Sequence, residues 1–317
     1  MYSYIKVKFL VLLAVLLVLV GCDNKKEQQT SANTLTIEHA QGKTDVPENP
    51  KKVVVFNTAT LDIMDALNIP VTAVPQSDVH YPTFLSKYGR KDYTNVGTLF
   101  EPNYEVLSSI QPDVIVAGGR ATDAYKKLND IAPTISLDID PNNFLSSLTQ
   151  RTEQLGSIFN KQNEAKKLIV DFNQKIEQLK TKTTTAGTAL VIMVNGGKMS
   201  AYGSKSRFGF VFDVLGFQPA TTFQEAGRHG NAVTSEFILS VNPQWIFVLD
   251  RDNAIGNKEA QSAQQVLDNE LIRKTAAWQQ NHIVYLDSSS MYIAGGIQTY
   301  SRLMDQIGVA LQSEPAY

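Results

Sequence analysis

Two arginines, Arg120 and Arg251, end the two copies of a repeated segment. The copies begin at Glu105 and Glu236 and align without a gap at an offset of 131 residues. A guanidinium group keeps its positive charge, donates hydrogen bonds in a fixed fork and stacks on aromatic rings, so it suits an anionic ligand better than lysine does. Either arginine alone could equally form a surface salt bridge. Their equivalent positions favour a shared binding role.

Each copy of the repeat predicts the same local structure. A short helix begins near the glutamate, a proline (Pro112 or Pro243) prevents its continuation, and an apolar run then forms a buried parallel strand. Further strand candidates, Val53 to Phe56 and Ala189 to Val194, precede the two copies. Strands that alternate with helices in both halves predict an α/β fold with two Rossmann-like lobes. Such sheets bind ligands at the carboxyl ends of their strands, where both arginines lie.

Between the two halves, residues 161–184 predict one long helix. The segment contains neither glycine nor proline. Its apolar residues recur with the spacing of one helical face: Ala165, Leu168, Ile169, Phe172, Ile176 and Leu179. We expect this helix to connect an N-terminal lobe (35–160) to a C-terminal lobe (185–317). A single stiff connector limits opening to a small rocking motion, so the cleft should be preformed.

The first 21 residues are organised like a secretory signal peptide. Lysines precede an apolar run, Phe9 to Val20, that is too short to span a bilayer comfortably. The run ends at Cys22 in the order Leu-Val-Gly-Cys, which is typical of a lipobox. We therefore expect residues 1–21 to be removed and Cys22 to carry lipid; the alternative is an ordinary secretory signal with a cysteine nearby. Cys22 is the only cysteine, so no internal disulfide forms. The polar residues 22–34 predict a flexible tether.

The charge balance argues against some partners. The chain has 31 Asp and Glu residues and 29 Lys and Arg residues, a formal net charge of −2 at pH 7. No basic stripe indicates nucleic acid or a second membrane contact. We expect a monomer outside the cytoplasm, anchored by lipid to the cytoplasmic membrane, at its periplasmic face or on the cell surface.

The lipobox, the paired Glu-to-Arg repeats and the long central helix together resemble the helical-backbone class of solute-binding proteins. This class serves ABC importers of siderophores, haem, cobalamin and some metals. The segment Asn95 to Glu105 is similar to the one that precedes the first repeat in ferric catecholate binders of the petrobactin, enterobactin and vibriobactin type. The resemblance covers the chain after the signal peptide. It implies a protein that captures a ferric catecholate siderophore and delivers it to a permease, with no cofactor of its own.

The resemblance also implies a set of ligand-binding residues. In petrobactin and enterobactin-fragment binders, three arginines surround a trianionic iron complex; Arg120, Arg207 and Arg251 match them. His229 and Tyr292 match the histidine and tyrosine that complete the coordination of iron held by a tetradentate siderophore. Glycines flank the Arg228–His229 pair and suggest a mobile loop. Alternatively, the histidine could be an ordinary loop residue and the tyrosine could simply pack between a helix and a strand.

By the same resemblance, Glu105 and Glu236 would contact arginines on the two subunits of a permease dimer. Two equivalent carboxylates suit a dimeric partner. Both glutamates could also stabilise the start of their helices through the helix dipole, and the two roles are compatible.

Other classes of function have less support. Direct capture of a bare transition metal needs a cluster of three or four ligands, whereas the four histidines lie in widely separated segments: His39, His80, His229 and His282. The main alternative is a haem or cobalamin binder of the same class. The sequence lacks a nucleophile elbow, a P-loop, a dinucleotide fingerprint and paired histidines on one helix, so we do not expect an enzyme.

Overall fold

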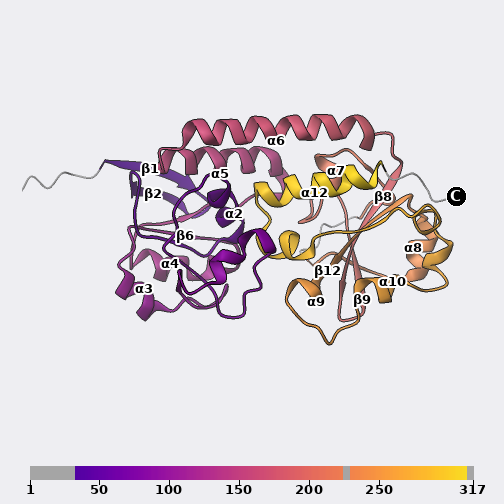
Figure 1. The fold of residues 1–317 in the computed structure, drawn as a ribbon, viewed down its shortest axis with the longest axis horizontal. Coiled ribbons are helices and arrows are strands. Elements are labelled where there is room, and N and C mark those ends of the chain that lie inside the picture. Colours follow the sequence, from indigo (N-terminus) through magenta and orange to yellow (C-terminus); the bar gives the residue numbers. More distant parts are fainter. Residues whose placement is uncertain (1–32, 224–228, 313–317) are drawn as a thin grey trace, which may run out of the picture. The chain divides into compact units, whose positions relative to one another are not determined.

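Two separate β-sheets, one in each half of the chain, form the framework of the fold (Figure 1). The computed structural model describes residues 33–223 and 229–312, so Cys22, the signal peptide and nearly all of the predicted tether lie outside it. The described residues from Thr34 onward belong to one compact unit. Within those ranges, no helix has the length and apolar character needed to cross a membrane.

The N-terminal half consists of a β-hairpin and a five-stranded parallel sheet in the order β5-β4-β3-β6-β7. Its strands are β1 (Thr34–His39), β2 (Gly42–Pro47), β3 (Val53–Val55), β4 (Ala73–Val74), β5 (Thr94–Asn95), β6 (Val114–Ala117) and β7 (Thr134–Ser136). Its helices are α2 (Thr58–Ala66), η1 (Thr83–Gly89), α3 (Tyr104–Ile110), η2 (Gly119–Ala124), α4 (Tyr125–Asn129), η3 (Pro141–Asn143) and α5 (Phe144–Ile158). Strand β1 thus begins at the last residue of the predicted tether.

The C-terminal half is built on a second sheet in the order β11-β9-β8-β12-β13, with β10 also paired to β8. Its strands are β8 (Thr188–Asn195), β9 (Lys198–Tyr202), β10 (Gln218–Pro219), β11 (Asn231–Val233), β12 (Trp245–Asp250) and β13 (Ile283–Tyr285). Its helices are α7 (Phe210–Asp213), α8 (Ser235–Val241), α9 (Arg251–Ala254), α10 (Ala263–Leu267), η4 (Ile272–Lys274), α11 (Ala276–Gln279), η5 (Ser290–Ala294) and α12 (Ile297–Ala310).

The two copies of the repeat fold alike, as the sequence predicts. Helices α3 and α8 each have seven residues and end at a left-handed residue, Gln111 (φ 51°) or Asn242 (φ 40°). The prolines that follow prevent either helix from continuing. Strands β6 and β12 come next, and each has a parallel neighbour on both sides. Both strands are therefore interior and almost wholly buried.

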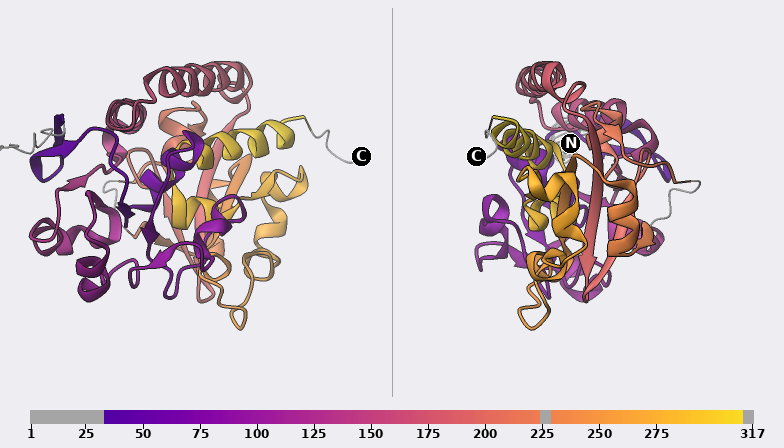
Figure 2. Two further views of the ribbon diagram at one scale, coloured as in Figure 1. Left: turned by 60° about the vertical axis from the view of Figure 1, so that its left-hand side comes forward. Right: turned by 90° about the vertical axis from the view of Figure 1, so that its right-hand side faces the viewer.

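The long helix α6 (Gln162–Thr183) lies beside α5 and α12 and spans the range predicted for the connector (Figure 1). Its buried face, which includes Phe172 and Ile176, belongs to one apolar cluster that also contains Val116 of the first sheet and Phe247 of the second. The opposite face of each sheet has a cluster of its own. Figure 2 shows helices on both sides of the second sheet. A wide separation of the lobes would expose the shared cluster to water. This exposure costs about 25 cal/mol of free energy per Å² of apolar surface.

Candidate ligand-binding cleft

A cavity of about 790 Å³ is lined by residues from both halves of the chain. Its volume falls within the range of sites that hold small molecules. The five side chains predicted to bind ligand all line it: Arg120, Arg207, His229, Arg251 and Tyr292. Their roles as ligand contacts remain predictions, but the fold brings them together from five separate segments.

Arg120 is directed into the cleft by a double-glycine turn after β6. Gly118 (φ 102°) and Gly119 (φ 59°) adopt conformations that few other residues tolerate. The Gly119 N–H and Asn57 Nδ2 both donate to Asp138 Oδ1, at 2.6 and 2.8 Å. A Cβ atom on Gly118 would lie 2.6 Å from the same oxygen. Asp138 therefore fixes the turn, a role that the sequence reasoning missed.

Arg251 and Arg207 reach the cleft from the second sheet. Arg251 follows β12 and begins α9, where Asp250 caps the helix by accepting a hydrogen bond from the Asn253 N–H at 2.9 Å. Arg207 lies in the turn after β9, with its guanidinium group 5.1 Å from the centre of the Phe208 ring. Arg120 and Arg251 are half-buried and Arg207 is exposed. The three cations thus converge from both lobes.

Tyr292 lies at the centre of the three guanidinium groups. Their central carbons are 5.3 Å (Arg120), 4.6 Å (Arg207) and 5.5 Å (Arg251) from the centre of its ring. Nη2 of Arg120 and Nη2 of Arg207 donate to its backbone oxygen at 2.8 and 2.6 Å. Arg251 Nε donates to its hydroxyl oxygen at 2.9 Å. The tyrosine therefore occupies the centre of the cationic cluster.

The three arginines of this cluster form no ion pair with an acid of the described residues. In residues 33–223 and 229–312, none of the three arginines has a carboxylate within ion-pair distance. Burial, with the neighbouring charge of Arg207, lowers the pKa of Arg120, although an arginine still stays protonated at neutral pH. Burial alone would raise the pKa of Tyr292, but the hydrogen bond from Arg251 and the three positive charges lower it below its ordinary value. The cleft thus favours negative charge.

His229 lies exposed on the wall of the cleft, next to a tight chain crossing. Gly230 (φ 74°) follows it, and a Cβ atom there would lie 2.8 Å from Tyr202 Cζ. The next strand, β11, pairs with β9, which ends at Tyr202. Gly230 is therefore needed for close packing against Tyr202. The sequence suggested a mobile loop, but mobility is not required to explain a glycine at this position. Gly227 and Arg228 lie outside the described residues.

Two further cleft residues were not predicted from the sequence. Phe100 is 66% exposed and lines the cavity, with its N–H donating to Thr98 Oγ1 at 3.1 Å. Lys198 begins β9 directly after a Gly-Gly turn and also lines the cavity. The described residues contain no group of three or more His, Cys, Asp or Glu side chains arranged to hold a metal ion. The described residues of the cleft thus offer cations and aromatic rings.

Glu105 and Glu236 occupy the same position in the two copies of the repeat. Each is the second residue of its helix and is exposed. Hydrogen bonds at the start of α8, from the backbone of Glu236 and then from Thr234, lower the pKa of Glu236. Each glutamate begins a helix that runs back to the start of the next strand, so Glu105 and Arg120 lie toward the same carboxyl edge of the first sheet, and Glu236 and Arg251 toward that of the second.

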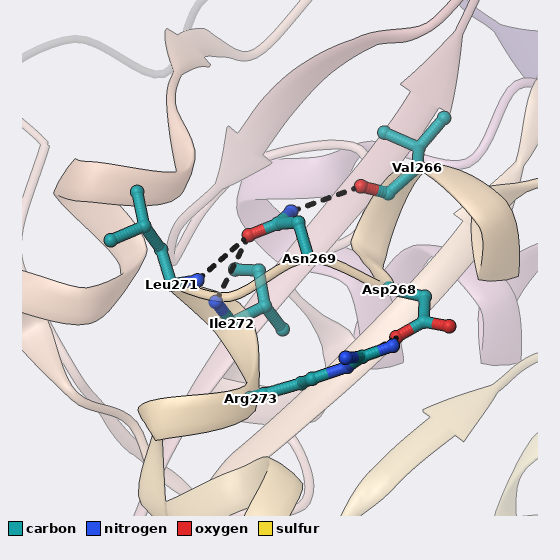
Figure 3. Close-up of polar contacts among 6 residues, drawn as sticks. All are labelled: Val266, Asp268, Asn269, Leu271, Ile272 and Arg273. Atoms are coloured by element: carbon teal, nitrogen blue, oxygen red, sulfur yellow. Dashed lines mark hydrogen bonds and ion pairs between the residues drawn. The ribbon is translucent and has the colours of Figure 1, made fainter.

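Asn269 joins the start of α8 to the loop after α10, and Figure 3 shows its bonds within that loop. Asn269 Nδ2 donates to Ser235 Oγ at 3.1 Å and to the Val266 backbone oxygen at 3.2 Å. Its Oδ1 accepts from the N–H groups of Leu271 and Ile272 at 3.1 Å each. The first of these bonds holds the residue that precedes Glu236, and the others fix Asn269 in its loop.

The chain resembles known binding proteins over most of its length. The family model of the periplasmic binding proteins matches residues 53–290. The petrobactin-binding protein YclQ of Bacillus subtilis is 36% identical over 298 residues, 92% of this chain and 91% of YclQ. The ferric-anguibactin-binding protein FatB of Vibrio anguillarum is 33% identical over 309 residues, 94% of this chain and 95% of FatB.

Solved structures agree with these sequence matches. The crystal structure of YclQ superimposes with a TM-score of 0.84 at 35% identity and covers 89% of this chain and 100% of YclQ. The catecholate-siderophore binding protein VctP of Vibrio cholerae superimposes with a TM-score of 0.81 at 30% identity and covers 87% of this chain and 100% of VctP. The chain belongs to the periplasmic binding protein family.

Proposed function

We propose that this protein captures a ferric catecholate siderophore outside the cytoplasm and delivers it to an ABC importer. The observation that carries the proposal is the cluster of three guanidinium groups around Tyr292, in a cavity of about 790 Å³. The names of YclQ, FatB and VctP, all binders of siderophores, support the same ligand class. Members of this family carry solutes, so the protein is a binding protein and not an enzyme.

The charge of the ligand explains the arginines. Three catecholate arms place six negative oxygens around Fe(III) and give a trianion, so a cleft that removes the complex from water must supply positive charge. Arg120, Arg207 and Arg251 supply three positive charges, and their planar groups can stack on catechol rings. Phe100, exposed on the wall of the cleft, offers another surface for an aromatic arm.

A tetradentate siderophore leaves two positions on octahedral iron open, and Tyr292 and His229 would fill them. The lowered pKa of Tyr292 favours the phenolate, the form that binds metal. A hexadentate siderophore fills all six positions and needs neither side chain. Tyr292→Phe and His229→Ala should therefore weaken tetradentate complexes selectively, and Tyr292→Phe should alter their charge-transfer absorption. Unchanged affinity and spectrum in both variants would limit the site to the arginines.

Delivery would use the two exposed glutamates and the lipid anchor. Glu105 and Glu236 are exposed, equivalent and ionisable, which suits contact with two permease subunits. Cys22 would hold the monomer at the cytoplasmic membrane through its lipid. Docking and anchoring rest on the sequence pattern and the repeat.

A fluorescence titration tests the choice of ligand. Purified protein is titrated with ferric tetradentate and hexadentate catecholates, with the same siderophores free of iron, and with haem and cobalamin. We expect quenching by the ferric complexes, with the iron-free forms at least about tenfold weaker because they lack the full trianionic charge. Preferential binding of haem or cobalamin would refute the proposal and favour the alternative ligand class.

A further inference from the structure

A polar stripe on helix α2 grips the segment that carries Tyr292. Thr58, Asp62 and Asp65 are spaced by four and three residues, so they share one face of the helix. Thr58 Oγ1 donates to the backbone oxygen of Ile293, the residue after Tyr292. Gln298 Nε2 donates to the Asp62 backbone oxygen at 3.0 Å and to Asp65 Oδ2 at 2.9 Å. An N-terminal helix thus holds residues more than 200 positions later in the sequence.

The carboxylate of Asp62 caps helix α12 from the other lobe. The N-cap residue of α12, Gly296, has no side chain to satisfy the first N–H groups of the helix. Asp62 Oδ1 accepts from the Gln298 N–H at 2.7 Å. Asp62 Oδ2 accepts from the N–H groups of Gly296 and Thr299 at 3.2 and 3.0 Å, and from Thr299 Oγ1 at 2.7 Å. Asp62 is 0% exposed and is not among the residues that line the cleft.

The contact is too close for any side chain at its centre. A Cβ atom on Gly296 would overlap the backbone oxygen of Ala59 and lie 2.6 Å from Asp62 Cβ. The residues immediately before it, Ser290–Ala294, form a π-helical turn, an irregular element that depends on its surroundings. Thr299 Oγ1 also accepts from the Gly295 N–H at 3.2 Å. The turn that presents Tyr292 is therefore fixed at its C-terminal end by α2.

We propose that Asp62 is the positioning residue for Tyr292. It holds the start of α12 against the N-terminal lobe, and so places the Tyr292 ring and backbone oxygen among Arg120, Arg207 and Arg251. The role does not require contact with the ligand. The proposal deepens the proposed function and rests on it only for the ligand measurement described below.

The first test follows the ionisation of Tyr292 in the ligand-free protein. Near-ultraviolet absorbance is titrated with base for the wild type, Asp62→Ala and Thr299→Val, each paired with the same chain carrying Tyr292→Phe. The difference within each pair isolates Tyr292. Thr299→Val removes one hydroxyl and keeps the backbone bonds, so it carries the test alone if Asp62→Ala fails to fold. Thr299→Ser should restore wild-type behaviour, and Asp92→Ala, at an exposed acid, is the control.

The sign of the change identifies its cause. A nearby negative charge raises the pKa of a phenol, so loss of the Asp62 charge alone would lower the pKa of Tyr292. Displacement of Tyr292 from the arginines would instead raise it toward the ordinary value of about 10. We expect a rise in both variants. An unchanged or lowered pKa in the folded variants would overturn the positioning role.

A second measurement uses the ligand. Both variants should lose about tenfold in affinity for a tetradentate ferric catecholate, the equivalent of one charge-assisted hydrogen bond, and keep their affinity for a hexadentate one. Equal losses for both ligands would contradict a role through Tyr292. If the wild type bound no ferric siderophore, the proposed function would fail, and the base titration would still decide whether Asp62 positions Tyr292.

Discussion

Replacing each cleft arginine by glutamine should separate the contribution of buried charge from that of exposed charge. Gln keeps much of the length and hydrogen-bonding capacity of Arg and removes the cation. A charge-assisted contact contributes about 1.5 to 3 kcal/mol, or roughly tenfold to a hundredfold in affinity. Arg120 is half-buried and Arg207 is exposed. Because water screens an exposed charge more strongly, Arg120→Gln should approach the upper value and Arg207→Gln the lower.

Arg251→Gln should add a second effect. Arg251 is the only one of the three arginines that bonds the Tyr292 hydroxyl, through Nε at 2.9 Å. Its loss should raise the pKa of Tyr292 as well as weaken trianionic ligands. Tetradentate complexes should therefore suffer more from Arg251→Gln than hexadentate complexes do.

Fluorescence titration with ferric catecholates at low and high salt provides the assay. The Debye length falls from about 30 Å at 0.01 M to about 3 Å at 1 M ionic strength. The contribution of the exposed Arg207 to affinity should therefore be smaller at high salt than at low salt. Arg90→Gln, at an exposed arginine outside the cleft, is the matched control. The role of buried charge is refuted if all three variants bind like the wild type, or if Arg207→Gln loses more affinity than Arg120→Gln at every salt concentration.

Three other predictions concern docking, anchoring and the buried acid. Charge reversal of both Glu105 and Glu236 to Lys should block uptake by cells and leave ligand affinity intact; normal uptake would remove the docking role. Cys22→Ser should release non-acylated protein that still binds ligand, as membrane fractionation and titration would show; loss of binding would contradict the tether. Burial raises the pKa of folded Asp62 to about 6 although four hydrogen bonds lower it, and the unfolded value is about 3.9. Between pH of about 4 and about 6, the folded state therefore holds a proton on Asp62 that the unfolded state has lost. The free energy of unfolding of the wild type, relative to that of Asp62→Asn, should fall by up to about 3 kcal/mol as pH rises through this range. Denaturant unfolding at several pH values measures this difference, and a constant difference would contradict it.

The repeat made much of the framework predictable from sequence. Pro112 and Pro243 locate the ends of α3 and α8, and the apolar runs after them become the interior strands β6 and β12. The positions of Arg120 and Arg251 follow because parallel strands end at one edge of a sheet. Local patterns were sufficient for these features because each depends on residues close together in the chain.

The supporting contacts could not be predicted in the same way. Asp62 looks like a polar residue on an amphipathic helix, and only its contact with Thr299, 237 positions away, reveals its role. Asp138 accepts a hydrogen bond from the Gly119 N–H, and Gly230 packs closely against Tyr202. Neither contact is visible in the sequence. Tertiary packing determines these roles, and no periodicity or spacing in the sequence encodes it.

Strands β6 and β12 have a mechanical consequence for delivery. Each lies between a helix that begins with an exposed glutamate and a cleft arginine, and each is stiff because both of its faces are packed. A glutamate and its arginine must therefore move as one rigid body. Any rocking of the lobes that changes the separation of Arg120 and Arg251 also changes the separation of Glu105 and Glu236. A change in the separation of the lobes is thereby converted into a distance on the outer surface, which a partner with two fixed contact points can measure.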